Sequence, residues 1–264
     1  MSAPLHVATL NLRNIADRWD ERLPLLLADV AALQPDLLGL QECVYALQQD
    51  RLLGAAGAAH YRSIRGWAGR PEYGNALLVR EPLAADGVER LDLGRNRSAV
   101  RARIALEGGR SVQVVVTHLH HVPADEDARE EQAAAMLVWL DGDVRADAPE
   151  GAGGADAPDA DATVVVGDFN AEPDEPTYRR MTAAGFRSAH LEANGAEPAV
   201  TWPSGIQAPG MDSDGEPGCL DYIWVRGAVA VESCRVVFDR PAVDDPTLYP
   251  SDHVGLSARL VIGP

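Results

Sequence analysis

The chain has 264 residues, of which 46% are hydrophobic and 24% charged, and its formal net charge is −17. This composition is typical of a soluble globular protein and excludes wholesale disorder. The negative charge disfavours long DNA or RNA as a partner, because the mean field repels polyanions. The sequence is nevertheless compatible with a local positive patch formed by basic residues at Arg95, Arg97, Arg101 and Arg103. A small phosphorylated substrate is compatible with this balance. Nothing in the sequence predicts an oligomeric state.

The cellular setting is predicted from cysteine usage and from segments that are missing. Three cysteines, Cys43, Cys219 and Cys234, have no CxxC spacing, which argues against a disulfide framework and a structural zinc site. The first residues lack the pattern of a signal peptide, and no apolar run reaches the roughly 20 residues of a membrane span. We therefore expect a cytoplasmic, soluble protein without a membrane span.

The first elements along the chain are two strands separated by a helix. A strand is predicted over His6–Asn11, and the apolar positions of Trp19–Leu33 recur every three or four residues, which predicts a helix with one buried face. Gln34-Pro35 ends that helix, and Asp36–Glu42 is predicted as a second buried strand. Each of the two strands ends in a polar side chain.

The later elements mix strands with two more helices. Strands are predicted over 75–79, 98–106, 111–117, 163–166, 220–225, 230–238 and 254–261, and helices over 125–140 and 175–184. Gly108-Gly109 separates two strands directly and predicts a hairpin, whereas helices separate others. The sheets should therefore be mixed, in an α+β or mixed α/β layered fold.

One domain is predicted over residues 1–264, because no segment has the composition of a long connection between two cores. The stretch from Asp141 to Ala162 is rich in Ala, Asp, Gly and Pro and cannot bury a core face. It is predicted to be a mobile acidic surface loop within the domain. Further loops are expected at 54–71, 123–129 and 193–218, where the sequence would set substrate specificity.

The segment TVVVGDFNAEP carries the first functional candidates. Thr163–Val166 has the composition of a strand covered on both faces, and Gly167 lets the chain turn where the strand stops. Asp168 and Asn170 then place a carboxylate and an amide at the rigid end of a strand, where they are suited to hold a metal, a water or a phosphate. The alternative for this segment alone is a strand followed by an Asx turn.

Four other segments place polar side chains at predicted strand ends. They supply Asn11, Glu42, His118, Asp221, Asp252 and His253. Carboxylates and amides without cysteine prefer a hard, oxygen-seeking ion, so Mg²⁺ or Mn²⁺ is favoured over zinc. Histidine supplies a proton carrier near neutral pH. The set indicates metal-assisted attack of water on phosphorus.

The ordered motifs LNLRN, LQE, THL, GDFN, LDYI and SDH resemble those of the endonuclease/exonuclease/phosphatase superfamily, which includes DNase I-like nucleases, and they cover nearly the whole chain. The resemblance implies a four-layer α/β/β/α sandwich, with two mixed β-sheets face to face and helices outside. It also implies that the motif residues meet at one rim of the sandwich.

The resemblance further implies roles for these residues. Glu42 would bind the divalent ion, with Asn11 and Asp252 completing or orienting its shell. Asp168 and Asn170 would position the phosphate or its water. His253, oriented by Asp221, would act as general base or stabilise the phosphorane, and His118 would protonate the leaving oxygen or stabilise its charge. The resemblance leaves open whether Asp168 or His253 takes the proton of the attacking water. It also leaves open whether one metal ion or two take part.

Four residues are candidates for substrate contact. Tyr73 and Asn75 belong to the segment YGNALL, which resembles a family segment near the substrate phosphate, and the alternative is a turn. Trp202 resembles a residue near the pocket mouth, where an aromatic ring stacks on a base or covers an acyl chain, and the alternative is a lid over the core. Arg97 is either a phosphate ligand or a surface arginine.

We therefore expect a Mg²⁺- or Mn²⁺-dependent hydrolase of phosphoric esters. A phosphodiester of a small or lipid-derived substrate is favoured over a monoester. The alternative is a nuclease acting on DNA or RNA, against which the charge of −17 argues. A non-catalytic interaction scaffold is a remote third possibility, because none of the key groups is missing.

Overall fold

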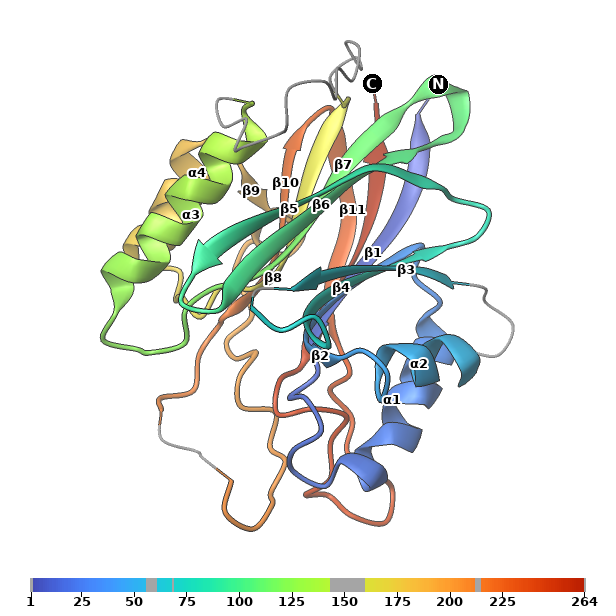
Figure 1. The fold of residues 1–264 in the computed structure, drawn as a ribbon, viewed down its shortest axis with the longest axis vertical. Helices are drawn as coiled ribbons and strands as arrows, with labels where there is room; N and C mark the ends of the chain where they lie inside the picture. The colour runs from blue at the N-terminus through green and yellow to red at the C-terminus, as the bar shows by residue number, and fades with distance from the viewer. Residues whose placement is uncertain (1, 56–60, 68, 143–159, 212–214, 264) are drawn as a thin grey trace.

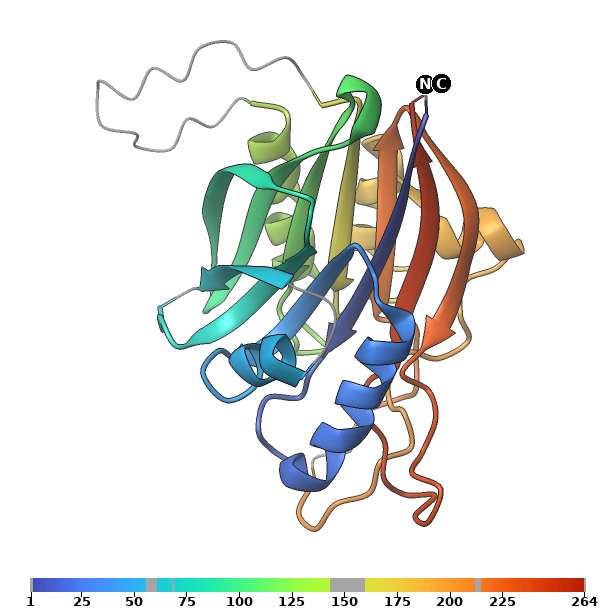
Figure 2. The same ribbon diagram turned by 90° about the vertical axis from the view of Figure 1, so that its right-hand side faces the viewer.

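The computed structural model describes residues 2–55, 61–67, 69–142, 160–211 and 215–263. Two β-sheets pack face to face, and helices cover their outer faces (Figure 1). The predicted four-layer α/β/β/α sandwich is therefore confirmed. The chain ends lie together at one end of the sandwich (Figure 2), where Ala3 of the first strand pairs with Ile262 of the last.

The first sheet has the strand order β11-β12-β1-β2-β4-β3. Its strands are β1 (Ala3–Asn11), β2 (Leu37–Val44), β3 (Tyr61–Trp67), β4 (Tyr73–Arg80), β11 (Val229–Val237) and β12 (Gly255–Ile262). Strands β1 and β2 run parallel, and the other pairings are antiparallel. The ends of β1 and β2 therefore emerge at the same edge, where Asn11 lies opposite Gln41.

The second sheet has the order β5-β6-β7-β8-β10-β9. Its strands are β5 (Ala85–Gly94), β6 (Arg97–Ala105), β7 (Ser111–His118), β8 (Ala162–Asp168), β9 (Arg187–Ser188) and β10 (Asp221–Gly227). Strands β7 and β8 run parallel, so that His118 lies opposite Asp168. The predicted hairpin at Gly108-Gly109 joins β6 to β7 through a short 3-10 turn.

Helices α1 (Trp19–Leu33) and α2 (Gln49–Ala55) lie on the side of the first sheet, and α3 (Glu126–Leu140) and α4 (Pro176–Ala183) cover the second (Figures 1 and 2). A short α5 (Ala189–Asn194) follows β9. Leu26 and Val30 of α1 are buried against the outer face of the first sheet, and Met136 of α3 is buried against the second. The predicted α1 and α3 are confirmed, and Asp125 precedes α3 as its N-cap.

The inner faces of the sheets form the main core, built from valine, leucine and isoleucine of both sheets. Gly39 of β2 marks a place where the sheets approach closely. A Cβ added there would lie 2.4 Å from Cγ2 of Val166 on β8. The close approach of these two strands joins the rims that carry the candidate site, since β2 contains Glu42 near its end and β8 ends at Asp168.

Three expectations from the sequence need correction. The expected loop over 54–71 contains β3, and the expected loop over 123–129 runs into the first turn of α3. Strand β5 was not predicted, because all ten of its residues are exposed or half-buried and show no alternating pattern. In the acidic insertion, Asp141 caps α3 and Ala162 begins β8, while residues 143–159 lie outside the described residues. No helix within the described ranges is long and apolar enough to cross a membrane.

Candidate active site

The candidate residues meet at the rim of the sandwich opposite the chain ends. Asn11 ends β1, and His118 and Asp168 end the parallel strands β7 and β8. Asp221 was expected at the end of a strand, but it begins β10. It still reaches the same rim, because β10 is antiparallel to β8 and Asp221 lies opposite Asp168. Asp252 and His253 likewise precede β12 instead of ending a strand.

Asp168 lies at the centre of the site. Its Oδ2 accepts a hydrogen bond of 2.9 Å from Nδ2 of Asn11, and this bond links the two sheets. The same oxygen lies 3.4 Å from Nε2 of His118 and 3.7 Å from Nε2 of His253. Oδ1 accepts the backbone N–H of Asn170 at 2.9 Å. Three side-chain nitrogens therefore converge on one carboxylate oxygen that is almost completely buried.

His253 and Asp221 form a buried hydrogen-bonded pair. Nδ1 of His253 lies 2.8 Å from Oδ2 of Asp221, which leaves Nε2 directed at Asp168. Burial alone lowers the pKa of His253, but the carboxylates of Asp221, Asp168 and Asp252 outweigh it and raise that pKa. Burial raises the pKa of Asp168, where His253 opposes the increase and Asp221 adds to it. An imidazole between two carboxylates favours its charged form.

His118 has the opposite environment. Its Nδ1 lies 3.1 Å from Nη1 of Arg97, and its ring is buried. Burial and the Arg97 guanidinium hold the pKa of His118 well below its usual range, and His253 and His121 add to this effect. The two histidines that face Asp168 therefore differ in charge: His253 favours the imidazolium, and His118 favours the neutral ring.

A β-bulge turns Glu42 toward the rim. The pairing of β2 with β4 shifts register between Leu40 and Cys43, and Glu42 has a left-handed φ of 53°. Bulges commonly redirect a side chain beside an active site. Oε2 of Glu42 accepts 2.9 Å from Nδ2 of Asn14, and Oε1 lies 3.5 Å from Nδ2 of Asn11. This half-buried carboxylate forms no ion pair with any described cationic side chain.

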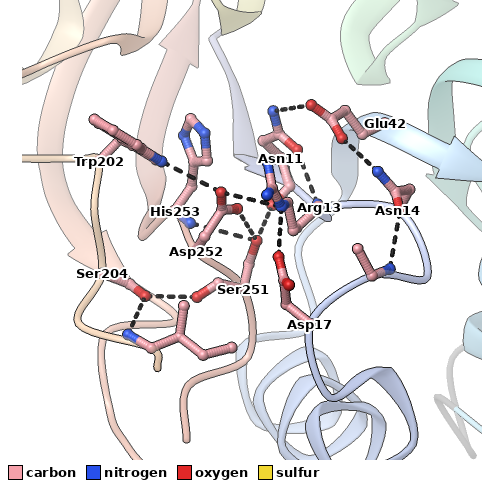
Figure 3. A network of polar contacts seen from close by, with 12 residues as sticks. Asn11, Arg13, Asn14, Asp17, Glu42, Trp202, Ser204, Ser251, Asp252 and His253 are labelled. Atoms are coloured by element: carbon pink, nitrogen blue, oxygen red, sulfur yellow. Dashed lines mark hydrogen bonds and ion pairs between the residues drawn. The ribbon is translucent and has the colours of Figure 1, made fainter. Parts of the chain in front are cut away.

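Asp252 lies on the other side of Asn11 and Arg13 from Glu42 (Figure 3). Its Oδ2 accepts a hydrogen bond of 3.2 Å from Nε1 of Trp202 and lies 3.6 Å from Nε of Arg13. Oγ of the preceding Ser251 donates to the backbone oxygen of Asn11 at 2.6 Å. The segment that carries Asp252 and His253 is thereby fixed to the end of β1.

Three of the four predicted substrate contacts line a cavity beside Glu42. Tyr73, Asn75, Arg97 and His118 all line it. Asn75 is 3% exposed, and its Nδ2 donates to the backbone oxygen of Ser98 at 2.8 Å, so this amide nitrogen links the two sheets. Burial and the nearby Glu42 carboxylate raise the pKa of Tyr73. Trp202 is outside this cavity lining and lies against Asp252.

Arg13, Asn14 and Arg22 belong to the site and were not singled out in the sequence. Arg22 is completely buried on α1, and its guanidinium donates to six backbone oxygens, including those of Asp17 at 2.7 Å and Pro250 at 2.8 Å. Asn14 holds Glu42, as described above. For Arg13 and Asn14 the available signal was the repetition of polar residues in LNLRN after a buried strand.

The donor set of the rim fits a hard divalent cation. Glu42 and Asp252 offer carboxylate oxygens, Asn11 and Asn14 offer amides, and the three cysteines are buried in the hydrophobic cores. Oxygen donors without thiolates favour Mg²⁺-like ions over zinc. Asp168, Asp221 and His253 also bring three ligand atoms within 4.8 Å of one another. Within that trio, Nδ1 of His253 is already hydrogen-bonded to Asp221.

The chain is similar in sequence to known proteins. The sequence matches the Endonuclease/Exonuclease/phosphatase family over residues 8–253. Nocturnin from Mus musculus is 29% identical over 265 residues, which cover 90% of this chain and 58% of the mouse protein. Nocturnin from Xenopus laevis is 27% identical over 270 residues, with 90% and 64% covered. The chain thus spans about 60% of the length of these curated relatives.

Solved structures share the fold. The human Nocturnin catalytic domain with a bound sulfate anion superimposes with a TM-score of 0.74 at 25% identity, covering 97% of this chain and 94% of that one. D. rerio TDP2 complexed with a single-strand DNA product gives a TM-score of 0.76 at 16% identity, with 97% and 98% covered. Since the family match extends over nearly the whole chain, this protein belongs to the endonuclease/exonuclease/phosphatase family.

Proposed function

We propose that this protein is a divalent-metal-dependent hydrolase that cleaves a phosphodiester in a small or lipid-derived phosphorylated substrate. The observation that carries the proposal is the convergence of Asn11, His118 and His253 on Oδ2 of Asp168, beside the Glu42 carboxylate, which forms no ion pair with a cationic side chain in the described part of the chain. Family membership supports a reaction at phosphoric esters. A scaffold without catalytic function would not need these groups to be complete.

Glu42 holds the cation in this proposal, and Asn11 and Asp252 complete or orient its shell. Mg²⁺ or Mn²⁺ suits these oxygen donors. When bound, the ion neutralises charge on the phosphate oxygens. Asn14 orients the Glu42 carboxylate through its 2.9 Å hydrogen bond, and Trp202 does the same for Asp252 at 3.2 Å. Arg13 lies between the two carboxylates and limits their mutual repulsion (Figure 3).

Asp168 and His253 divide the proton chemistry. His253, charged between Asp221 and Asp168, stabilises the negative charge that develops on the phosphorane oxygens. Asp168 is the better acceptor for the proton of the attacking water, because burial and Asp221 raise its pKa and so increase its basicity. Asn170 fixes the Asp168 carboxylate through its backbone N–H. His118 faces the leaving oxygen.

The choice of substrate rests on charge and on the cavity. A net charge of −17 opposes a long polyanion, whereas the Arg97 guanidinium places a local positive charge in the wall of the cavity. Human Nocturnin holds a sulfate, which resembles a phosphate in shape and charge. The second candidate is a nuclease acting on DNA or RNA. D. rerio TDP2 is complexed with single-strand DNA, but at 16% identity that similarity shows the fold alone.

A substrate panel tests the proposal. Bis-p-nitrophenyl phosphate, p-nitrophenyl phosphate, supercoiled plasmid and poly(A) are each incubated with the protein and Mg²⁺ or Mn²⁺, with EDTA in parallel. We expect metal-dependent release from the diester exceeding that from the monoester, with both polymers intact. Nicked plasmid or shortened poly(A) at comparable rates would favour the nuclease, and no metal-dependent release from any substrate would overturn the proposal.

The expected cytoplasmic setting remains part of the proposal. Cys43, Cys219 and Cys234 are all free and buried, which is compatible with a reducing compartment. Fractionation of expressing cells with an antibody to the chain tests this directly. We expect the protein in the cytosolic fraction, and its recovery with membranes or outside the cell would contradict the expectation.

A further inference from the structure

Arg97 has an unusual environment for an arginine in an acidic protein. Its Nη1 lies 3.1 Å from Nδ1 of His118, and its Nη2 lies 3.0 Å from Nδ1 of His121. No described carboxylate forms an ion pair with it, although the neighbouring Arg95 pairs with Asp125 at 2.8 Å. The guanidinium therefore donates to two imidazole rings, and no described carboxylate lies within ion-pair distance of it.

The hydrogen bond to His118 determines where that ring carries its hydrogen. A guanidinium has only donors, so Nδ1 of His118 must be the acceptor. A neutral imidazole that accepts at Nδ1 carries its hydrogen on Nε2. That Nε2 lies 3.4 Å from Oδ2 of Asp168, and His118 is one of the residues that line the cavity beside Glu42. The ring consequently presents an N–H, and not a lone pair, to the reacting groups.

The backbone holds Arg97 firmly in this place. A two-residue turn joins β5 to β6, with Gly94 paired to Arg97 across it. Arg95 and Asn96 occupy the turn with left-handed φ values of 52° and 58°, the geometry of a tight hairpin. Arg97 is thus the first residue of β6 at the same rim as the end of β7. Nδ2 of Asn75 also fixes the next residue, Ser98, at 2.8 Å.

We propose that Arg97 is a positioning residue that fixes His118 in the tautomer with its hydrogen on Nε2, so that His118 serves the reaction as a neutral hydrogen-bond donor. This inference rests on the proposed function for its catalytic consequence, but not for the tautomer itself. His118 then stabilises charge on the leaving oxygen by hydrogen bonding and does not deliver a proton as an imidazolium. The lowered pKa of His118 is in agreement with this role.

The first test reads the tautomer directly. Long-range ¹H–¹⁵N spectra of the ¹⁵N-histidine-labelled protein distinguish a protonated from an unprotonated ring nitrogen, and the spectrum of His118→Gln assigns the signal. We expect Nδ1 of His118 unprotonated and Nε2 protonated at pH 7. A hydrogen on Nδ1, or an imidazolium, would overturn the proposal whether or not the protein hydrolyses phosphodiesters.

The second test separates positioning from substrate binding. Arg97→Met removes the donor, Arg97→Lys retains a cationic donor, and Arg95→Met is the matched control on the same turn. With bis-p-nitrophenyl phosphate we expect Arg97→Met to lower kcat about 10- to 100-fold and to mix the His118 tautomers. Arg97→Lys should retain part of the kcat and part of the tautomer preference of His118. Arg95→Met should change neither kcat nor the tautomer.

Two outcomes contradict the positioning role. One is an Arg97→Met variant that raises only KM while kcat and the tautomer stay as in the wild type, since that result assigns Arg97 to substrate binding. The other is a loss of kcat without any change in the His118 spectrum. If the wild type shows no metal-dependent hydrolysis but the expected tautomer, the proposed function fails and the tautomer assignment stands.

Discussion

Nδ1 of His253 lies 2.8 Å from Oδ2 of Asp221, and the exposed fractions of these side chains are only 7% and 0%. Oδ1 of the same carboxylate has no hydrogen-bond partner in the described part of the chain. Asp221 therefore directs its charge at one partner, His253. Such a carboxylate fixes the tautomer and orientation of the imidazole and favours its charged form.

Replacing this carboxylate by an amide should impair the reaction. Asp221→Asn keeps the shape but removes the charge that holds His253 protonated, and we expect kcat to fall by a factor on the order of 10² to 10⁴. Initial rates with bis-p-nitrophenyl phosphate at saturating Mg²⁺ measure it. Asp86→Asn, at an exposed residue of β5, is the control. A kcat within twofold of the wild type would remove His253–Asp221 from the mechanism.

Glu42 should determine metal affinity. The bulge in β2 directs its carboxylate to the rim, where amides but no described cation contact it. Glu42→Gln should weaken Mn²⁺ binding roughly 10- to 100-fold. Isothermal titration of metal-free protein with Mn²⁺ measures the affinity without reference to turnover. Glu72→Gln, at an exposed residue nearby in sequence, should bind as the wild type does. Equal affinities for wild type and Glu42→Gln would place the cation elsewhere.

Arg22 should stabilise the fold more than any surface arginine. It is completely buried and donates to six backbone oxygens of the segments around the site, and burial lowers its pKa to about 10. Arg22→Met removes the guanidinium donors and leaves buried oxygens such as those of Leu12 and Pro250 without them, so the free energy of unfolding should fall by about 3–5 kcal/mol. Urea unfolding measures this, with the exposed Arg51→Met as the control. A change below about 1 kcal/mol would contradict the structural role.

Acid should destabilise the protein through His6. Burial lowers the pKa of His6 to about 4 from 6.5, with Arg259 adding to the effect, and Nε2 lies 2.8 Å from Oγ of Ser257. Below pH 6.5 the unfolded chain binds a proton that the folded chain does not. This contribution to stability is therefore complete above pH 6.5 and is lost as the pH falls toward 4.

Unfolding free energies measured between pH 7 and pH 4 test this sign. His6 should account for about 2–3 kcal/mol of the decrease, and His6→Gln should flatten the curve by that amount. His190→Gln, at a histidine of α5 that is less buried than His6, is the control and should leave the curve unchanged. A wild-type curve that is level over this range would contradict the assignment to His6.

The sequence predicted the parts of the fold that bury apolar residues at a regular spacing. β8 and α1 are of this kind, with Val164–Val166 and Leu26 buried. β5 escaped prediction because an exposed edge strand has no apolar period, and so did the β5–β6 turn. That turn places Arg97, the hydrogen-bond partner of His118, at the rim. Without it, Arg97 is indistinguishable from a surface arginine in the sequence.

The candidate site was predicted as a set of residues, but not as a geometry. Polar residues that follow or precede buried strands identified Asp168 and His253. The bulge that turns Glu42 follows from register, which a single strand does not encode. Arg22 was missed because a charged residue on a helix usually belongs to the solvent face, and only tertiary packing shows that backbone oxygens surround it.

Metal dependence tests the central claim most directly. Protein freed of metal with EDTA is titrated with Mg²⁺ while the hydrolysis of bis-p-nitrophenyl phosphate is followed, and Glu42→Gln is treated in parallel. We predict no hydrolysis without metal, a saturable rise for the wild type, and a rise for Glu42→Gln displaced to at least about tenfold higher Mg²⁺. Hydrolysis that persists in EDTA, or identical Mg²⁺ curves for the two proteins, would contradict a metal-dependent phosphodiesterase organised around Glu42 and Asp168.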